Sequence, residues 1–359
     1  MTAGTTMVSE AGKVDDVVAT LEGVCAARGL DALTARLAAL RGLLAGDLAE
    51  VEEALTLVGV EADTPAHKSA RHLLALGGKR LRPICVALAS QVGSGFTPAA
   101  RTFAIAVEMV HSATLLHDDV VDLGDRRRGA DAARVVYGNA ASIFGGDWLL
   151  ADALCRVQAA GVEGALERLL GVVKEMVAAE ALQLEARGRV RTSTSDYFRI
   201  VQGKTASLFR WAMFAGGRAG GVPARECELL ESYGGMLGLA FQIVDDVLDF
   251  AGDPGSTGKD LLADLREGKM TYPLLVAVER DPGLAPALEG NCQGDEVTVT
   301  PELARRIARV MAEGGVVEDC LELATRMCKD AARCLEALPA SPARAALEDV
   351  ALATALRRR

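Results

Sequence analysis

The 359-residue sequence has few aromatic residues and no cysteine pattern typical of a metal centre or a disulfide framework. Aromatics make up only 4% of the residues although half of the chain is apolar. Ala, Leu and Val therefore supply most of the core, and this composition favours helices over sheets. The eight cysteines include no CxxC pair. We expect them to be reduced, mostly buried thiols in a cytoplasmic protein.

The sequence also lacks the marks of a secreted, membrane-spanning or nucleic-acid-binding protein. The N-terminal stretch "MTAGTTMVSEAGKVDD" has no apolar core of a signal peptide, and no apolar run reaches the roughly 18 residues of a membrane span. A net charge of −10 argues against a nucleic-acid surface, which needs a basic stripe. We therefore expect a soluble protein, in which an anionic small ligand would need local clusters of Lys and Arg.

Helical periodicity dominates the chain from about residue 31 onward. Apolar residues recur at three- and four-residue spacing in the segments 32–55, 101–122, 145–183, 197–214, 225–250 and 302–336. Thr300 is predicted to cap a helix that starts at Pro301, and "EVTVT" (296–300) is the only clear strand-like alternation. We expect residues 31–359 to form one all-α domain, a multi-helix bundle around a central cavity, preceded by a loosely ordered lead-in over 1–30.

Three carboxylates occur in the apolar stretch "LLHDDVVD", at Asp118, Asp119 and Asp122. In a helix, Asp118 and Asp122 would lie on one face about 5–6 Å apart, with Asp119 beside them. Such a cluster destabilises a helix unless its charge is neutralised, and burial increases that cost. A single cluster of this kind could equally be an acidic helix face exposed to solvent, rather than a site that binds cations.

A second stretch repeats the pattern and favours a metal site. "QIVDDVLDF" places Asp245, Asp246 and Asp249 at the same DDxxD spacing, again among apolar residues. Two such clusters on separate helices are hard to explain as surface charge, and we interpret them as two walls of one cavity. Mg²⁺ prefers oxygen ligands and is usually held by one or two carboxylates together with substrate phosphates.

Basic residues stand close to the acids in the sequence. "GGKRLRP" contains Lys79, Arg80 and Arg82, and "GDRRRG" places Arg126–Arg128 shortly after the first acid cluster. Either group alone would be an ordinary solvated charge run. In a chain of net charge −10, cations beside acids indicate a polyanion bridged by metal, because Arg forks suit phosphate oxygens and Lys supplies a point charge.

Taken in order along the chain, these motifs resemble those of the trans-isoprenyl diphosphate synthases, the polyprenyl synthetase family. The resemblance extends from about residue 65 to the C-terminus and rests on "GGKRLRP", "HSATLLHDDVVD", "RRRG", "GKTASLF", "FQIVDDVLDF", "TGKD" and "GKMTYP". It implies an all-helical bundle around a deep cavity, usually as a homodimer, and a prenyltransferase that condenses isopentenyl diphosphate with an allylic diphosphate. The Mg²⁺-dependent reaction would proceed by ionisation, condensation and elimination to an all-trans polyprenyl diphosphate.

The same resemblance implies roles for individual residues. About three Mg²⁺ ions would hold the allylic diphosphate, with ligands from Asp118, Asp119, Asp122, Asp245, Asp246 and Asp249. Isopentenyl diphosphate would bind to Lys79, Arg82, His111 and Arg128. The allylic diphosphate would bind to Arg127, Lys204, Thr205, Gln242, Lys259 and Lys269. Among all of these, the residues expected to contribute most to catalysis are Asp118, Asp122, Asp245, Lys204 and Lys269.

The residues one helical turn before the first acid cluster bear on product length. The resemblance places the product tunnel beneath that cluster, and Ala113 and Thr114 lie on the side of the acids. Family members with short products carry large aromatics near these positions, whereas both residues here are small. We therefore expect a long product of about C30 or more, with geranylgeranyl diphosphate, about C20, as the alternative.

Two other functions are alternatives at this point. A terpene cyclase of the same architecture usually has one DDxxD cluster, a different second metal motif and no Lys and Arg set for a second diphosphate. A non-catalytic regulatory subunit of a prenyl synthase would be expected to lose acids from one cluster, and neither cluster here has lost any.

Overall fold

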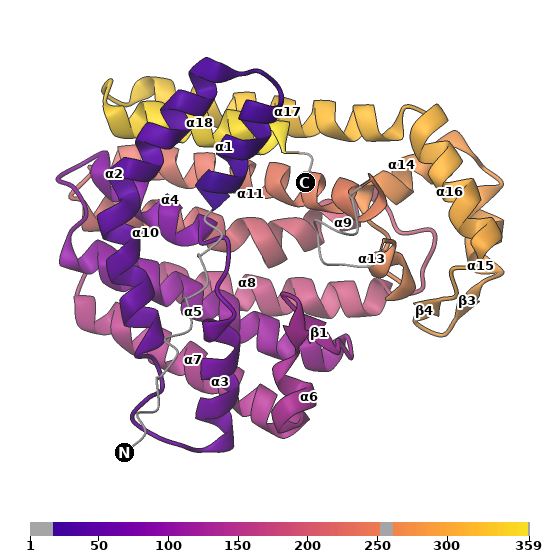
Figure 1. The fold of residues 1–359 in the computed structure, drawn as a ribbon, viewed down its shortest axis with the longest axis horizontal. Coiled ribbons are helices and arrows are strands. Elements are labelled where there is room, and N and C mark those ends of the chain that lie inside the picture. The colour runs from indigo at the N-terminus through magenta and orange to yellow at the C-terminus, as the bar shows by residue number, and fades with distance from the viewer. Residues whose placement is uncertain (1–16, 252–260, 358–359) are drawn as a thin grey trace, which may run out of the picture.

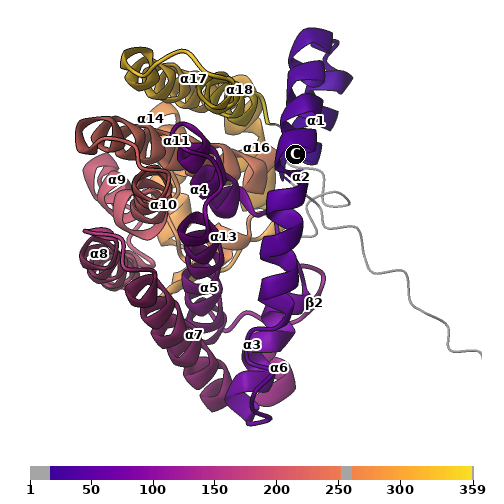
Figure 2. The ribbon, with the colours of Figure 1, turned by 90° about the vertical axis from the view of Figure 1, so that its left-hand side faces the viewer.

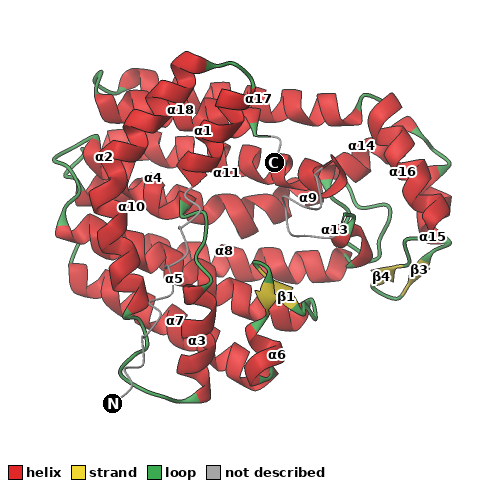
Figure 3. Cartoon of the chain, in the orientation of Figure 1, coloured by secondary structure: helices red, strands yellow, loops and turns green. Residues whose placement is uncertain are grey.

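A computed structural model describes residues 17–251 and 261–357, and helices make up nearly all of the elements in these ranges (Figure 1). Figure 3 shows the strands of the described part as two short pairs. None of the helices within these ranges has the length and apolarity needed to cross a membrane. The all-α fold class predicted from the sequence is therefore confirmed.

The helices of the described residues are α1 Val17–Ala27, α2 Asp31–Thr56, α3 Pro65–Ala75, α4 Leu81–Gln91, α5 Pro98–Val121, α6 Ala133–Tyr137, α7 Asn139–Ala160, α8 Ala165–Ala186, α9 Thr194–Val201, α10 Ser207–Ala219, α11 Ala224–Ala251, α13 Ala263–Arg266, α14 Tyr272–Arg280, α15 Leu284–Glu289, α16 Pro301–Glu313, α17 Val316–Cys334 and α18 Pro342–Leu356. A π-helical turn, η1 Gln202–Ala206, joins α9 to α10, and a 3₁₀ turn, η2 Leu335–Ala337, follows α17. The antiparallel strand pairs are β1 Arg126–Arg127 with β2 Ala130–Asp131, and β3 Cys292–Gln293 with β4 Glu296–Val297.

Threonine caps and glycines determine where several of these helices begin and end. Thr300 accepts a hydrogen bond from the Leu303 amide at 3.2 Å, with proline at the first helical position, so the predicted start of α16 is confirmed. The helical segment predicted over 145–183 is interrupted, because Gly161 and Gly164 take φ angles of 66° and 78° and separate α7 from α8. Gly315, which also has a left-handed conformation, likewise separates α16 from α17.

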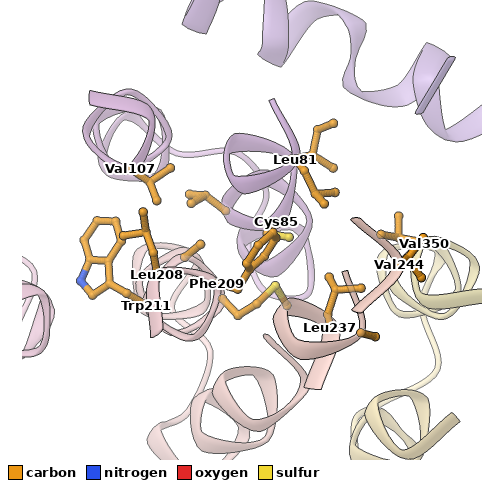
Figure 4. Close-up of a cluster of buried hydrophobic side chains, with 14 of the residues drawn as sticks. Leu81, Cys85, Val107, Leu208, Phe209, Trp211, Leu237, Val244 and Val350 are labelled. Atoms are coloured by element: carbon orange, nitrogen blue, oxygen red, sulfur yellow. The ribbon is translucent and has the colours of Figure 1, made fainter. Parts of the chain in front are cut away.

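Helix α10 lies at the centre of the core. It contacts α4, α5, α8 and α11, and its Leu208, Phe209 and Trp211 are fully buried. Figure 4 shows the side chains that neighbouring helices contribute to the same cluster, among them Leu81, Cys85, Val107, Leu237, Val244 and Val350. Since α5 and α11 carry the two acid clusters and both pack against α10, the core holds the clusters in a defined relation to each other.

The N-terminal helices lie along one side of the bundle. Helix α1 falls within the segment 1–30 that was predicted as a lead-in, and its Leu21 and Cys25 are buried. It contacts α2 and α18, and Figure 2 shows α1 and α2 together at that side. Arg36 of α2 donates from Nε to Asp349 Oδ2 of α18 at 2.9 Å, which ties the two ends of the described chain together. The division of the chain after residue 30 stays a prediction.

Candidate active site

The first acid cluster lies at the C-terminal end of α5. The Asp119 side chain is 1% exposed and accepts a hydrogen bond from Arg127 Nε at 2.9 Å. Burial raises the pKa of Asp119, and the Arg127 guanidinium opposes that rise. Oδ2 of Asp119 is buried and has no hydrogen-bond partner. One oxygen of a buried carboxylate is therefore available to a cation.

The other two acids of this cluster contact cations from distant parts of the chain. Lys204 Nζ of η1 lies 3.5 Å from Asp118 Oδ2 and 2.5 Å from Glu180 Oε1 of α8. Asp122 contacts Lys269 Nζ through Oδ2 at 2.8 Å and the Arg187 guanidinium through Oδ1. These ion pairs neutralise the like-charge repulsion that three neighbouring carboxylates would otherwise experience.

The second acid cluster lies on α11, and Asp246 is its buried member. Asp246 accepts hydrogen bonds from the Tyr197 hydroxyl at 2.6 Å and from Gln242 Nε2 at 2.8 Å. Burial raises the pKa of Asp246 to about 7, while these two hydrogen bonds oppose the rise. Donors from α9 and α11 thus hold both oxygens of this carboxylate.

The C-terminal end of the described chain reaches the second cluster. Arg357, which follows α18 and is fully buried, bonds to Asp245 Oδ1 through its guanidinium. The same guanidinium carbon lies 4.5 Å from the centre of the Phe241 ring, and burial lowers the pKa of Arg357 to about 10. The Arg357 guanidinium therefore neutralises Asp245, the leading acid of the second cluster.

The last acid of the second cluster is held by the backbone: Asp249 accepts a hydrogen bond from the Ala263 amide at 3.2 Å.

Adjacent residues of η1 connect the two acid clusters. Lys204 contacts Asp118, whereas Thr205 donates to Gln242 Oε1 at 2.9 Å, and Gln242 donates to Asp246. A cavity of about 120 Å³ lies at this junction. Its lining includes Gln183, Arg187, Tyr197, Lys204, Thr205, Gln242, Asp246, Asp264, Lys269 and Thr271. Cations bonded to the first cluster and an acid of the second cluster therefore border the same cavity.

Close packing positions the turn that carries Lys204 and Thr205. A Cβ on Gly203 would stand 2.6 Å from the Ala179 Cβ and 2.9 Å from the Glu175 carbonyl oxygen of α8. Glycine is therefore needed for η1 to approach α8 this closely. Single π-helical turns of this kind occur frequently at functional sites.

The basic loop before α4 is held by a buried ion-pair network. Arg80 takes a left-handed conformation with φ of 51° at the start of α4. Its NH1 lies 2.5 Å from Glu108 Oε1 of α5, and its NH2 lies 3.0 Å from Glu52 Oε2 of α2. Lys79, the residue before it, is exposed. The network therefore fixes the turn between Lys79 and Arg82, two residues predicted to bind isopentenyl diphosphate.

His111 of α5 lies among arginines. Burial lowers the pKa of His111 well below its usual value, and the charges of Arg82 and Arg128 lower it further. The Arg82 guanidinium carbon lies 4.7 Å from the centre of the Phe209 ring, and burial lowers the pKa of Arg82 to about 10. The Arg128 guanidinium lies against Gly78, where a Cβ would stand 2.9 Å from NH2. Three residues predicted to bind one diphosphate are therefore grouped in a cationic region.

Of the predicted site residues that the structure describes, those that line the cavity are Lys204, Thr205, Gln242, Asp246 and Lys269, and the others lie outside its lining. Ala113 is buried, and Thr114 donates its hydroxyl to the His111 carbonyl at 2.8 Å within α5. Neither residue lines the cavity, so their role in product length stays a prediction. Lys259 lies outside the described residues.

Sequence reasoning missed several side chains that contact the acid clusters. Glu180 and Arg187 reach the first cluster from α8 and the residue after it, while Tyr197 and Arg357 reach the second. Each is a single polar residue in an ordinary helical or turn segment, with no repeated spacing to mark it. The sequence carries no signal that would have found these residues, because only the packing of distant segments brings them to the acids.

The carboxylates fit a magnesium site that is completed by other oxygen ligands. Within the two described ranges, no three Asp, Glu, His or Cys side chains lie close enough together to hold a metal ion by themselves. The donor set nevertheless consists of carboxylates from two helices and includes the unpartnered Oδ2 of Asp119. Mg²⁺ usually retains water or phosphate oxygens in addition to one or two carboxylates, so this set suits it.

Comparison with known proteins relates the chain to a group of enzymes. The model of the polyprenyl synthetase family matches residues 64–304. The heptaprenyl diphosphate synthase component 2 of Geobacillus stearothermophilus is 33% identical over 317 residues, covering 88% of this chain and 98% of the relative. The octaprenyl diphosphate synthase of Escherichia coli (strain K12) is 39% identical over 207 residues, covering 58% of this chain and 64% of the relative.

A solved structure agrees in fold and sequence. The polyprenyl synthase of Caulobacter crescentus CB15, complexed with calcium and isoprenyl diphosphate, has a TM-score of 0.83 at 36% identity. The similarity covers 89% of this chain and 97% of the other. Since the family match spans more than half of the sequence and the relatives agree over most of it, the chain belongs to the polyprenyl synthetase family.

Proposed function

We propose that this family member is a cytoplasmic trans-prenyltransferase that condenses isopentenyl diphosphate with an allylic diphosphate. The observation that carries the proposal is the connection of two DDxxD clusters at one cavity through the adjacent residues Lys204 and Thr205. Cations contact acids of both clusters, and a site for two diphosphates requires such cations.

Magnesium is the metal that we propose, at about three ions per site. Asp118 and Asp122 of the first cluster and Asp245 of the second would be the leading ligands. The remaining ligands, or residues that hold water of the metal shell, would be Asp119, Asp246 and Asp249. Mg²⁺ bound there would act as a Lewis acid that neutralises charge on the leaving diphosphate. Calcium in the described Caulobacter complex supports a divalent cation at this kind of site.

Lys204 and Lys269 would bind the allylic diphosphate and stabilise its charge as the bond to the prenyl group breaks. Both amines already contact acids of the first cluster, so they are held at the cavity before substrate arrives. This preorganisation favours the transition state, in which negative charge develops on the bridging oxygen. The other residues that we assign to this subsite are Arg127, Thr205, Gln242 and Lys259.

The second diphosphate, that of isopentenyl diphosphate, would bind to the region around His111. A lowered pKa keeps His111 neutral, so it adds a hydrogen-bonding group without adding charge. The double bond of this substrate would attack the allylic cation, and the released diphosphate would accept the proton that is then lost. Buried apolar residues beside the acids, including Leu116 and Val247, would keep water from the cation. The residues assigned to this subsite are Lys79, Arg82, His111 and Arg128.

A long product of about C30 or more is part of the proposal. Ala113 and Thr114 are small residues one turn before the first acid cluster, so neither can form an aromatic floor for a product tunnel. The names of the heptaprenyl and octaprenyl relatives support the same length class. Geranylgeranyl diphosphate, about C20, is the alternative product.

We further propose a homodimer that forms through the outer face of α7 and α8. Leu170, Val177 and Leu184 recur at seven-residue spacing on α8 and are exposed, as is Phe144 on the neighbouring α7. Exposed apolar surface of this kind is typical of protein–protein interfaces. The Geobacillus relative is named as a second component, so a different subunit is the alternative partner for this face.

The test incubates purified protein with Mg²⁺, labelled isopentenyl diphosphate and allylic primers of several lengths. We expect metal-dependent elongation and, after dephosphorylation, a chromatographic product of about C30 or longer. Asp118→Asn and Asp245→Asn should each lower the rate by about 100-fold or more. Asp330→Asn on α17, an acid outside the cavity, is the matched control and should leave the rate unchanged. Absence of elongation with every primer would contradict the proposal.

Neither alternative from the sequence is favoured. A terpene cyclase would convert one allylic diphosphate to a hydrocarbon or alcohol without consuming isopentenyl diphosphate, which the same incubation would detect. A regulatory subunit would elongate no primer alone. Both acid clusters are complete in the sequence. The first is connected to the cavity through its ion-pair partner Lys204, and the second borders it through Asp246, as a catalytic chain requires.

A further inference from the structure

Arg187 borders the cavity although no sequence motif accounts for it. It follows the last residue of α8, and its side chain is only 11% exposed. The guanidinium contacts Asp122 Oδ1, and its Nε is buried without a hydrogen-bond partner. A nearly buried guanidinium with an unused donor therefore faces the cavity at the first acid cluster.

The backbone holds Arg187 beside Lys269. The Gly188 amide donates to the Gly268 carbonyl at 3.0 Å, and both glycines take left-handed φ angles, 69° and 71°. A Cβ on Gly188 would stand 2.5 Å from the Gly294 carbonyl oxygen in the turn between β3 and β4. Side chains therefore cannot replace these glycines without displacing the contact that sets the two cations side by side.

Lys269 and Arg187 differ in whether an acidic partner remains to them when Asp122 binds another group. Lys269 contacts Asp122 Oδ2 at 2.8 Å and also Glu267 Oε2 at 2.6 Å. For the Arg187 guanidinium, by contrast, the acid contacted within the described part of the chain is Asp122. If Asp122 turns to a metal ion, Lys269 retains an acid, whereas Arg187 is left as a nearly buried charge that needs a new anion.

We propose that Arg187 is a further binding residue for the allylic diphosphate. This inference rests on the proposed function. When Asp122 becomes a metal ligand, the guanidinium moves from Asp122 to phosphate oxygens, which its planar fork can bind in bidentate fashion. Thr271 lines the same cavity and has a buried hydroxyl without a partner, which supplies a second donor to the same anion.

Direct binding of inorganic pyrophosphate in the presence of Mg²⁺ tests this role without relying on turnover. Isothermal titration of the full-length chain should give a dissociation constant about tenfold higher for Arg187→Gln than for the wild type. Arg189→Gln is the matched control, since Arg189 is 63% exposed, pairs with Glu185 at 3.3 Å and does not line the cavity. We expect it to bind pyrophosphate within about twofold of the wild type.

Steady-state kinetics identify which diphosphate the guanidinium contacts. We expect Arg187→Gln to raise KM for the allylic substrate by about tenfold and to leave KM for isopentenyl diphosphate unchanged. A rise in the second KM alone would overturn the assignment. Arg187→Lys retains the ion pair with Asp122 but loses the fork, and we expect pyrophosphate binding about threefold weaker. If Arg187→Gln fails to fold, the Arg187→Lys variant provides the test instead. Pyrophosphate binding by Arg187→Lys that is as tight as in the wild type would then contradict the inference.

The main rival is that Arg187 only occupies Asp122 until the metal binds. In that case Arg187→Gln would bind Mg²⁺ more tightly and bind pyrophosphate as well as the wild type, which would overturn the inference. If the wild type elongates primers and Arg187→Gln shows unchanged pyrophosphate binding and an unchanged KM for the allylic substrate, this inference is refuted but the proposed function is not. A wild type that elongates no primer would instead refute the proposed function.

Discussion

Replacing Glu108 with Gln tests whether a buried ion-pair network supports the active site. The Glu108 and Arg80 side chains are each 3% exposed, and their Oε1 and NH1 atoms lie 2.5 Å apart. Arg80 adopts a left-handed backbone conformation at the start of α4, between Lys79 and Arg82. Its side-chain contacts therefore hold the turn that presents two proposed substrate-binding cations.

The size of the stability loss in Glu108→Gln depends on which contacts Arg80 keeps after the substitution. Burial lowers the pKa of Arg80, but Glu108 and Glu52 outweigh this effect and raise it, so the guanidinium stays charged. Removing one partner of a buried pair costs about 3–5 kcal/mol when the other charge is left unpaired. Here Glu52 remains 3.0 Å from NH2 with a side chain 25% exposed, and the new amide still offers an acceptor. We therefore expect Glu108→Gln to lower the free energy of unfolding by about 2–3 kcal/mol.

Urea unfolding, followed by far-ultraviolet circular dichroism at one protein concentration, measures this loss. Glu50→Gln is the matched control, because Glu50 of α2 pairs with Arg101 at the surface, where both side chains are about half exposed. Such a pair contributes about 0–1 kcal/mol. If Glu108→Gln unfolded at the same urea concentration as Glu50→Gln, with an equal slope, the buried network would not stabilise the fold and the reasoning would be refuted.

Three further predictions concern titration, product length and assembly. Because the pKa of folded His111 lies well below 6.5, protons bind this residue in the unfolded chain at a higher pH than in the folded one, so the wild type should lose more unfolding free energy than His111→Gln as the pH falls below about 7. Ala113→Tyr adds an aromatic ring at a buried position before the first acid cluster and should shorten the product sized by chromatography. Val177→Glu places a charge on the apolar face of α8 and should convert dimers to monomers in size-exclusion chromatography with light scattering, whereas Leu352→Glu on α18 should not.

Each of these predictions has an outcome that contradicts it. The stability from a neutral His111 is present above the unfolded pKa and is lost as the pH falls through it, so equal pH dependence of wild type and variant would refute the burial argument. An unchanged chain length in Ala113→Tyr would show that the tunnel does not pass this residue. Dimers that persist in Val177→Glu would place the interface elsewhere.

Much of the fold and of the acid clusters could be predicted from local sequence patterns. Helical periodicity located most helices, and the Thr300 cap located the start of α16. The interruption between α7 and α8 was missed, because Gly161 ends α7 and Gly164 precedes α8 only through their left-handed conformations. The apolar pattern continues across them, so periodicity alone predicts one long helix.

The partners of the acids could not be predicted in the same way. Asp122 meets Arg187 across 65 residues, and Asp245 meets Arg357 across 112. A charged side chain in a sequence has many potential partners, and the choice among them depends on which segments pack together. Here that choice follows from the packing of α5, α8 and α11 against α10 and from the packing of α18 against α11.

The all-α class, the two DDxxD clusters and the motifs that resemble a diphosphate synthase could be read from the sequence, since each depends on residues a few positions apart. Only the folded chain shows that Lys204 and Thr205 connect the clusters, that burial and neighbouring arginines lower the pKa of His111, and that Arg187 lies beside Lys269. The physical reason is that burial and ion pairing depend on distances between remote segments, which only the packed core establishes.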